Sequence, residues 1–318
     1  MKTIFLDDHT ILNEPCVATI GFFDGVHKGH QFLIHQVTEE AKRSDLKSVV
    51  VTFDRHPREV LQSDYIPTLL TTTDQKLKLL SETSVDIVVV LHFTVEMASL
   101  TAKQFMTTVL SEQLNVRKLV IGYDHRFGHD RTEGFDDYVR YGRELNMDVI
   151  LNQVFKLEGS GPEVSSSYIR RLLTDGDVEM ARRCLGHPYV LSAHVVRGFQ
   201  EGRKLGFPTA NLDMNELHQL MPLEGVYAVK ARFSDQSPWL TGMTSIGTRP
   251  TYNGTRVSVE TNILGNFHED VYGKMMEVAF FKRFRSEFKF NCVEELRNQM
   301  IEDEKMINDY FLNLENYE

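Results

Sequence analysis

An alternation of strand-like and helix-like segments over the first half of the chain constrains its fold more than any other feature of the sequence. The strand-like segments are short, nearly continuous runs rich in Val and Ile, at 16–20, 48–53, 86–93, 118–122 and 148–154. Helical patterns lie between them, at 29–42, 74–82, 102–114 and 134–145. Continuous apolar runs are typical of strands that are buried on both faces. The alternation therefore predicts a parallel sheet covered by helices, which binds ligands beyond the carboxyl ends of its strands.

The second half of the chain has a different pattern. Short alternating segments, separated by Gly, Pro, Asn and Asp, lie near 189–196, 225–233, 240–246, 256–263 and 276–284. They predict an antiparallel sheet or small barrel, and a helical pattern at 291–312 predicts a final helix that packs across it. Two short helical patterns, at 167–173 and 178–185, precede Gly186-His187-Pro188, which interrupts the chain. We place the domain boundary there, which gives domains 1–186 and 187–318.

Charge and cysteine content narrow the possible partners. The 318-residue chain has a formal net charge of −10, which argues against a broad nucleic-acid-binding surface and against an anchor on an anionic membrane. Cys16, Cys184 and Cys292 lie far apart and predict neither a disulfide framework nor a metal cluster. The sequence predicts no signal peptide and no membrane-spanning stretch. We therefore expect a reduced, cytoplasmic protein with small-molecule ligands.

A glycine-rich turn, Gly-Phe-Phe-Asp-Gly-Val-His-Lys-Gly-His at 21–30, follows the first apolar run. Between a strand and a helix, such a turn presents backbone N–H groups at the positive helix end, where phosphate binds well. His27 and His30 lie on one side of the first helical turn and can donate to phosphate oxygens as charge develops there. An isolated pair would more often only cap a helix, and the sequence offers no obvious third ligand for zinc. The glycines favour nucleotide phosphate chemistry instead.

Three further polar segments fall where strands end or where a helix begins. Thr-Phe-Asp-Arg-His-Pro at 52–57 and Gly-Tyr-Asp-His-Arg-Phe-Gly at 122–128 each end a core strand. Ser-Ser-Ser-Tyr-Ile-Arg-Arg at 165–171 starts a helix, with serines suited to the N-cap and arginines that could meet phosphate. By themselves, these residues could equally serve as turn and capping residues.

A second glycine-rich loop, with glycines at 198, 202 and 206, precedes Phe-Pro-Thr-Ala-Asn-Leu at 207–212. Thr209 and Asn211 alternate on an extended segment and so face the same way. Two neutral oxygen ligands side by side can hold Mg²⁺, which keeps several waters and takes phosphate oxygens as further ligands. Glu260 lies in an alternating stretch. As a carboxylate inside a small barrel it could accept a proton from a substrate hydroxyl, although a solvent-facing glutamate is the commoner case.

Together these motifs resemble the prokaryotic bifunctional riboflavin kinase/FAD synthetase family over nearly the whole chain. The motif at 21–30 is similar to the adenylyltransferase module of that family, and Gly-Phe-Pro-Thr-Ala-Asn at 206–211 is similar to its kinase module. Gly-Val-Tyr-Ala at 225–228 and Phe-Arg-Ser-Glu-Phe-Lys-Phe at 284–290 also look like family motifs. The resemblance implies a Rossmann-like α/β nucleotidyltransferase domain, followed by a small antiparallel β-barrel kinase domain with a C-terminal helix.

The resemblance also implies two reactions. The C-terminal module would phosphorylate riboflavin with ATP to give FMN. The N-terminal module would transfer AMP from a second ATP to FMN, giving FAD and pyrophosphate. In this module His27 and His30 would be catalytic, and His56, Asp124 and Arg126 would lie at the flavin. The implied ATP-binding residues are Gly21, Phe22, Phe23, Asp24, Gly25, His27, His30, Ser166, Ser167 and Arg170.

In the kinase module, the resemblance makes Glu260 the catalytic base for the riboflavin 5′-hydroxyl. Thr209 and Asn211 would be the Mg²⁺ ligands. The implied ATP- and Mg-binding residues are Gly198, Gly202, Gly206, Pro208, Thr209 and Asn211. The expected partners are ATP, riboflavin and FMN, with no nucleic acid and no membrane, and the expected state is a monomer or a weak homo-oligomer.

Four positions depart from the family pattern. Arg55 replaces a proline, Ser167 a threonine, His125 a phenylalanine and Asn262 a histidine. None of these removes a residue with a central implied role, but Arg55 and His125 lie where the adenylyltransferase would hold flavin phosphate. Two alternatives therefore stay open: only the kinase module is active, or the chain is a non-enzymatic regulator that binds a flavin or a nucleotide.

Overall fold

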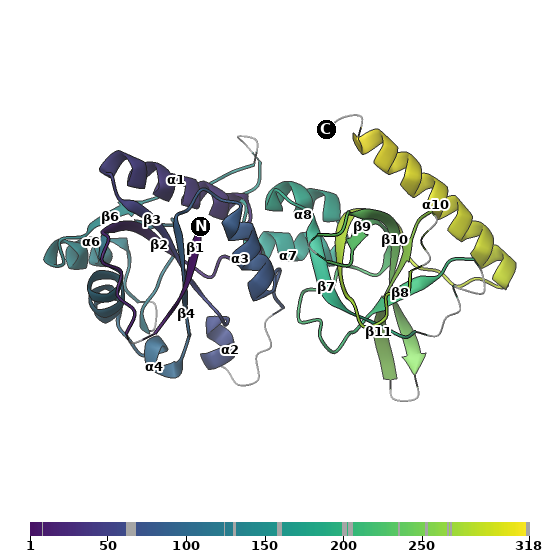
Figure 1. The fold of residues 1–318 in the computed structure, drawn as a ribbon, viewed down its shortest axis with the longest axis horizontal. Helices are drawn as coiled ribbons and strands as arrows, with labels where there is room; N and C mark the ends of the chain where they lie inside the picture. Colours follow the sequence, from purple (N-terminus) through teal and green to yellow (C-terminus); the bar gives the residue numbers. More distant parts are fainter. Residues whose placement is uncertain are drawn as a thin grey trace. The chain divides into compact units, whose positions relative to one another are not determined.

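The computed structural model divides into two compact units, Met1–Ser166 and Ser167–Glu318 (Figure 1). The domain boundary predicted at 186/187 lies inside the second unit, because two helices at the start of that unit precede it. The structure describes the chain except for Asp8, 62–67, Asp124, 130–131, 158–160, 199–201, 203–205, Asp235, 252–253, Asn266, His268 and 316–318.

The first unit is built on a six-stranded parallel sheet with the strand order β1-β4-β3-β2-β5-β6. Its strands are β1 (Lys2–Leu6), β2 (Cys16–Ile20), β3 (Lys47–Phe53), β4 (Ile87–Leu91), β5 (Val116–Ile121) and β6 (Asp148–Leu151). Every residue of β2 and β4 is buried, as the continuous apolar runs predicted. The parallel sheet expected from the sequence is therefore confirmed.

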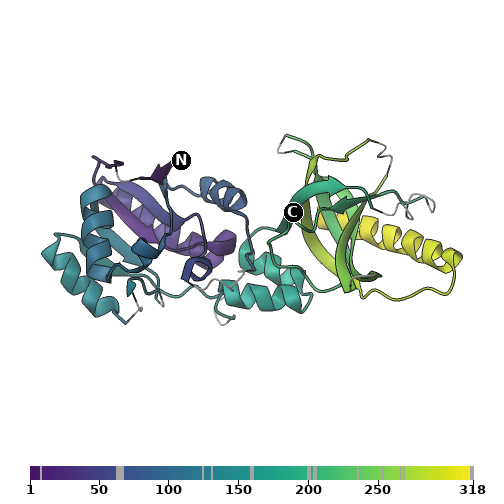
Figure 2. The same cartoon turned by 90° about the horizontal axis from the view of Figure 1, so that it is seen from below.

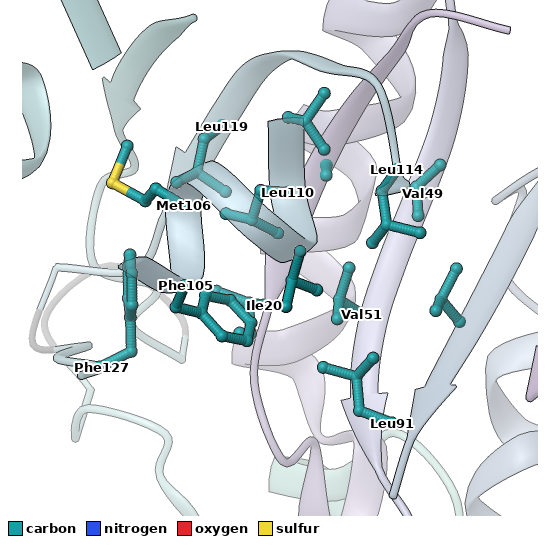
Figure 3. Packing of buried hydrophobic residues seen from close by; sticks show 14 of the residues in the cluster. Ile20, Val49, Val51, Leu91, Phe105, Met106, Leu110, Leu114, Leu119 and Phe127 are labelled. Atoms are coloured by element: carbon teal, nitrogen blue, oxygen red, sulfur yellow. The ribbon is translucent and has the colours of Figure 1, made fainter. Parts of the chain in front are cut away.

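Helices cover both faces of this sheet. They are α1 (Lys28–Ser44), α2 (Pro57–Leu61), α3 (Thr73–Ser81), α4 (Val95–Ala98), α5 (Ala102–Phe105), the π-helical segment η2 (Met106–Gln113) and α6 (Phe135–Glu144). On one face, Met106 and Leu110 of η2 pack with Ile20 and Val51 of the sheet (Figure 3). On the other face, α1 packs with a separate buried cluster. Burial on both faces explains why these strands lack a polar alternation.

The strand order reverses beside β2, which places the glycine-rich turn at a ligand-binding position. From β2 the chain continues to β3 and β4 on one side, and β5 then returns to the other side of β2. In open parallel sheets, the carboxyl ends of the strands at such a reversal form the usual ligand crevice. The turn after β2 and the segment after β5 both begin at this point.

The second unit contains a closed antiparallel barrel with the order β10-β11-β8-β7-β12-β9. Two helices, α7 (Ser166–Thr174) and α8 (Val178–Leu185), precede it. The strands are β7 (Tyr189–Val196), β8 (Thr209–Leu212), β9 (Gly225–Arg232), β10 (Leu240–Thr251), β11 (Gly254–Ile263) and β12 (Met275–Arg285). Closure removes exposed sheet edges, and the barrel predicted from the alternating segments is confirmed.

The last helix, α10 (Val293–Glu315), lies along the outside of this barrel in both Figures 1 and 2. Its Ile307 and Phe311 pack against outward-facing Val226, Ala228 and Met243 of the barrel wall. A buried ion pair also connects the helix to the end of β12: the Arg285 guanidinium donates to the Asp303 carboxylate, with an Nη2–Oδ2 distance of 2.6 Å. The final helix therefore covers one outer face of the barrel.

Candidate active sites

The turn after β2 has a strained backbone. Phe23, Gly25 and Val26 have φ values of 55°, 80° and 38°. Positive φ is ordinary for glycine, but a β-branched residue there is a true outlier. The side chains of Phe23 and Val26 are almost completely buried. Since strained residues persist only where surrounding contacts impose them and cluster at functional sites, the conformation of this turn indicates a site rather than a simple connection.

Asp24 supplies much of the constraint on this turn. Its buried carboxylate accepts hydrogen bonds from the backbone N–H groups of Leu70 and Thr71, at 2.9 and 3.1 Å. The Thr71 hydroxyl accepts from the Gly25 N–H, and the Ser166 hydroxyl donates to the Asp24 carbonyl oxygen. The Asp24 side chain therefore fixes the turn to the segment before α3, and its predicted contact with ATP stays a prediction.

The two histidines lie together at the start of α1. His27 is the N-cap residue, and its Nδ1 accepts from the backbone N–H of His30 at 3.3 Å. The two imidazole rings stack with centroids 3.5 Å apart. His27 is only 5 % exposed, and the His30 Nδ1 is buried with no hydrogen-bond partner among the described residues. The close spacing predicted from the sequence is thus observed, with His27 buried and His30 partly exposed.

Burial also sets the charge of His30. The pKa of His30 is lowered well below its usual range, first because burial disfavours the imidazolium and then because His27, His125 and Lys76 lie nearby. A neutral imidazole keeps one N–H donor. His30 can therefore donate a hydrogen bond to an anionic oxygen without carrying a positive charge of its own.

The remaining residues predicted for this module lie in different settings. His56 contacts the Phe22 ring edge-on, with centroids 4.9 Å apart, and its Nδ1 accepts from the Arg58 backbone N–H. Arg126 is exposed at the segment after β5, and Asp124 lies outside the described residues. Ser167 and Arg170 lie on α7, in the second unit. The roles of these residues stay predictions.

The sequence interpretation missed Lys76 of α3, which is only 2 % exposed. Its Nζ donates to the carbonyl oxygens of Phe22 and Phe53, at 3.2 and 2.7 Å. One signal was present in the sequence, because Lys76 precedes Leu80 by four residues and so shares its buried helix face. A lysine on the apolar stripe of a helix is a local inconsistency of the kind that marks functional positions.

In the second unit, Thr209, Asn211 and Glu260 lie together on neighbouring strands. Glu260 pairs directly with Asn211 in the β8–β11 register. The Thr209 hydroxyl donates to the Glu260 Oε2 at 3.3 Å. The side chain of Asn262 donates to the Pro208 carbonyl oxygen at 2.7 Å. The threonine and asparagine predicted to face the same way are therefore beside the predicted base.

Glu260 does not point into the barrel, and that expectation is wrong. Val259 and Thr261 are fully buried, and Thr261 shares a hydrogen bond with Thr244 inside the barrel. Because side chains alternate along a strand, Glu260 lies on the outer face, where it is partly exposed. A base on the outer wall is open to a substrate, whereas the filled interior of a six-stranded barrel is not.

Two of the three predicted loop glycines next to this cluster make close approaches. A Cβ on Gly198 would lie 2.5 Å from the Asn211 side-chain nitrogen, and one on Gly202 would lie 2.4 Å from the Phe207 carbonyl oxygen. Gly206 has a φ of 90°, a conformation that favours glycine. Gly202 therefore needs glycine because backbone approaches it, and Gly206 because of its φ, whereas a Cβ at Gly198 would require the Asn211 side chain to move.

A second carboxylate near this face lies in the motif at 284–290, for which the sequence predicted no role. Ser245 lies opposite Glu260 in the β10–β11 register, and its hydroxyl donates to the Glu287 carboxylate. Glu287 follows the end of β12, two residues after Arg285. The segment between β12 and α10 thus reaches the strand next to Glu260. Only the long-range register reveals this, because Glu260 and Glu287 are far apart in sequence.

Clusters of His, Cys, Asp and Glu suited to a metal ion, and helices suited to a membrane, are both absent from the part of the chain that the structure describes. Among the described residues, no group of three or more His, Cys, Asp and Glu side chains could hold a metal ion. Thr209 and Asn211 belong to none of these four residue types, so this result does not bear on the Mg²⁺ site predicted from them. No helix that the structure describes is both long and apolar enough to cross a membrane.

Comparisons with known proteins agree with the two sites. The FAD synthetase family model matches residues 9–168, and the riboflavin kinase family model matches residues 185–311. The bifunctional riboflavin kinase/FMN adenylyltransferase of Escherichia coli K12 is 38% identical over 94% of this chain and 93% of its own. That of Bacillus subtilis is 36% identical over 99% of both chains.

A solved structure extends the similarity to the fold. A crystal structure described as a macrolide-efflux protein from Streptococcus pneumoniae matches with a TM-score of 0.86 and 31% identity, over 97% of this chain and 99% of that one. Both family models occur here in the order that the sequence motifs predicted. The resemblance is confirmed, and the chain belongs to the bifunctional riboflavin kinase/FMN adenylyltransferase family.

Proposed function

We propose that this chain makes FAD from riboflavin in two steps at two separate sites. The second unit would phosphorylate riboflavin with ATP to give FMN, and the turn after β2 would bind the ATP that adenylylates FMN. The supporting observation is that two chemically different sites, a stacked histidine pair and a partly exposed carboxylate beside neutral oxygen ligands, lie on different folds of one chain. Each suits one of the two reactions.

In the adenylyl transfer, a phosphate oxygen of FMN forms a bond to the α-phosphorus of ATP, and the bond from that phosphorus to the bridging oxygen breaks. The departing pyrophosphate gains negative charge. Neutral His30, stacked on His27, has an N–H to donate to that charge. Asp24 would act by holding the turn in its strained shape.

In the kinase reaction, the riboflavin 5′-oxygen forms a bond to the γ-phosphorus of ATP, and ADP leaves. Glu260 would take the proton of the hydroxyl, and its outward position gives the substrate access. Thr209 and Asn211 supply the neutral oxygen donors that fit Mg²⁺, which when bound would neutralise charge on the phosphate oxygens. The absence of a Cβ at Gly198 leaves room for the Asn211 side chain.

Other parts of this proposal rest on the family pattern. His56, Asp124 and Arg126 are proposed to contact flavin phosphate, and Ser166, Ser167 and Arg170 the phosphates of ATP. A cytoplasmic location and a monomeric or weakly associated state are proposed on the same basis. All are consistent with small-molecule substrates.

One incubation tests both reactions. The protein is incubated with riboflavin, ATP and Mg²⁺, and riboflavin, FMN and FAD are resolved by chromatography. We expect FMN to form first and FAD to follow. FMN that accumulates without FAD would support the kinase-only alternative, and no turnover would support the regulator.

Two variants test the assignment of the sites. His30→Ala should abolish FAD formation and spare FMN formation, whereas Glu260→Ala should block FMN formation and spare conversion of supplied FMN to FAD. The matched controls are His35→Ala, an exposed histidine on the same helix, and Glu302→Ala, an exposed glutamate on α10. Loss of both activities in either site variant, with the fold intact, would contradict the two-site proposal.

A further inference from the structure

The burial of Lys76 requires an explanation, because a lysine ammonium is almost never fully buried unless it is paired. A capping box formed by Thr72 and Gln75 fixes the start of α3, and the Lys76 N–H makes the first helical hydrogen bond, to the Thr72 carbonyl oxygen. The side chain is therefore held one turn into the helix. A cation near a helix N-terminus is unfavourable, so neither the local helix nor hydrophobic packing accounts for it.

The ammonium of Lys76 joins the carboxyl ends of two adjacent strands. Its Nζ donates to the Phe53 carbonyl oxygen, at the end of β3, and to the Phe22 carbonyl oxygen, in the turn after β2. The same nitrogen lies 4.2 Å from the centre of the Phe22 ring. Phe22 in turn contacts His56 edge-on. One buried cation thus supports both the phosphate-binding turn and a residue predicted to lie at the flavin.

The acidic groups that face Lys76 are committed elsewhere. Asp24 accepts from the backbone of Leu70 and Thr71, and Asp54 contacts the His92 ring at 2.6 Å and the Phe93 N–H at 3.2 Å. The third titratable group beside Lys76 is His30, and the charge of Lys76 disfavours the His30 imidazolium. The charge of Lys76 is therefore only partly compensated, by carboxylates that hydrogen-bond to other groups.

We propose that Lys76 is a positioning residue for adenylyl transfer, which holds the turn at 21–30 and the Phe22 ring in their binding geometry and places a fixed positive charge beneath the substrate phosphates. This inference rests on the proposed function of the first unit. The inference goes beyond that function because it gives a role to Lys76, a residue outside the motifs that acts through the backbone of the turn.

The charge of Lys76 gives this role a pH signature. Burial lowers the pKa of the Lys76 ammonium to about 8, while Asp24 and Asp54 partly oppose that effect. Above that pH the group becomes a neutral amine, which can still donate to carbonyl oxygens but offers no charge. FAD formation should therefore decline as pH rises past 8, while a residue that is only structural would produce no such decline.

The test compares Lys76→Met with the wild type, in the full chain, for both activities. Methionine keeps the length of the side chain and removes the charge and the donors. We expect kcat/KM for FAD formation from supplied FMN to fall roughly 10- to 100-fold, since small displacements of positioned groups cost that much, while FMN formation from riboflavin stays unchanged. Lys78→Met is the control, because it makes the same change two residues along α3, where the side chain is not buried.

The pH profile separates positioning from folding. The ratio of wild-type to Lys76→Met activity should shrink from about pH 7 to about pH 9.5, as the wild-type ammonium loses its proton. Lys76→Arg, whose guanidinium stays charged throughout, should show no such decline. Equal FAD formation in Lys76→Met and the wild type, or a ratio that does not change with pH, would overturn the proposal.

ATP binding, measured by calorimetry on the wild type and on Lys76→Met, distinguishes this inference from the proposed function. If the wild type makes no FAD, the proposed function fails, and the binding comparison still decides the role of Lys76. Weaker ATP binding in Lys76→Met than in Lys78→Met would support a charge beneath the phosphates. If Lys76→Met and Lys78→Met bind ATP equally well, the proposed charge beneath the phosphates is overturned.

Discussion

The ion pair between Arg285 and Asp303 offers the sharpest test of how the barrel and its final helix are held together. Asp303 is fully buried and accepts from the Arg285 Nε at 3.0 Å and Nη2 at 2.6 Å, and from the Gln299 side chain at 3.0 Å. The change to test is Asp303→Ala. It removes the acceptor for all of these donors and leaves the guanidinium without its carboxylate.

The magnitude follows from the burial of the two partners. Removing one member of a buried ion pair typically costs about 3–5 kcal/mol of unfolding free energy. The Arg285 side chain is 18% exposed, and its Nη1 still donates to the Ser286 carbonyl oxygen. We therefore expect a loss near the lower end, about 3 kcal/mol. With a urea slope of roughly 2 kcal/mol per molar, the midpoint should move down by about 1.5 M.

The assay can report on the second unit alone. Trp239 is the only tryptophan of the sequence, and the Arg232 guanidinium of β9 lies 4.4 Å from the centre of its ring. Its fluorescence should therefore follow unfolding of the barrel in urea. Asp309→Ala, an exposed aspartate on the same helix, is the control and should change the free energy of unfolding by less than about 0.5 kcal/mol.

A double variant shows whether the ion pair itself is responsible. Arg285→Met combined with Asp303→Leu removes both charges and should restore stability to within about 1 kcal/mol of the wild type, because apolar replacements of buried pairs are often neutral. The reasoning is refuted if Asp303→Ala shifts the midpoint no further than Asp309→Ala does. It is equally refuted if the double variant is as unstable as the single one.

Two further predictions concern the turn at 21–30. Asp24→Ala leaves the N–H groups of Leu70 and Thr71 without an acceptor, at about 1–3 kcal/mol each, and should lower FAD formation while FMN formation continues. Asp24→Asn keeps the oxygen that accepts both and should keep most FAD formation in the chromatographic assay; equal losses in the two variants would show that the charge itself is needed. His30 is neutral when folded but takes up a proton near pH 6.5 when unfolded, so the unfolded state binds more protons below that pH, and stability should fall with decreasing pH by at most about 1.4 kcal/mol per unit. Unfolding followed by circular dichroism at several pH values should show a shallower fall in His30→Gln, and parallel curves would contradict this.

The elements that the sequence predicted best are those defined by local pattern. The continuous apolar run at 16–20 is β2 at those residues, and the alternating segment at 189–196 is β7. Short or irregular elements were missed. The edge strand β1 carries exposed Lys2 and Thr3 and has no buried residue, so it gives no strong period. The single helix expected at 102–114 is α5 followed by a π-helical segment, since helical periodicity does not distinguish their hydrogen bonding.

The chemical types at the two sites followed from the sequence by itself: histidines after a glycine-rich turn, and a threonine, an asparagine and a glutamate on extended segments. Only the tertiary structure decided how they act. The face on which Glu260 lies depends on the register of the closed barrel, and the neutral state of His30 depends on its burial. Lys76 reaches the turn only because α3 packs against the ends of β2 and β3. The physical reason is that periodicity records each segment's own buried face, whereas register, burial and charge arise from residues distant in the chain.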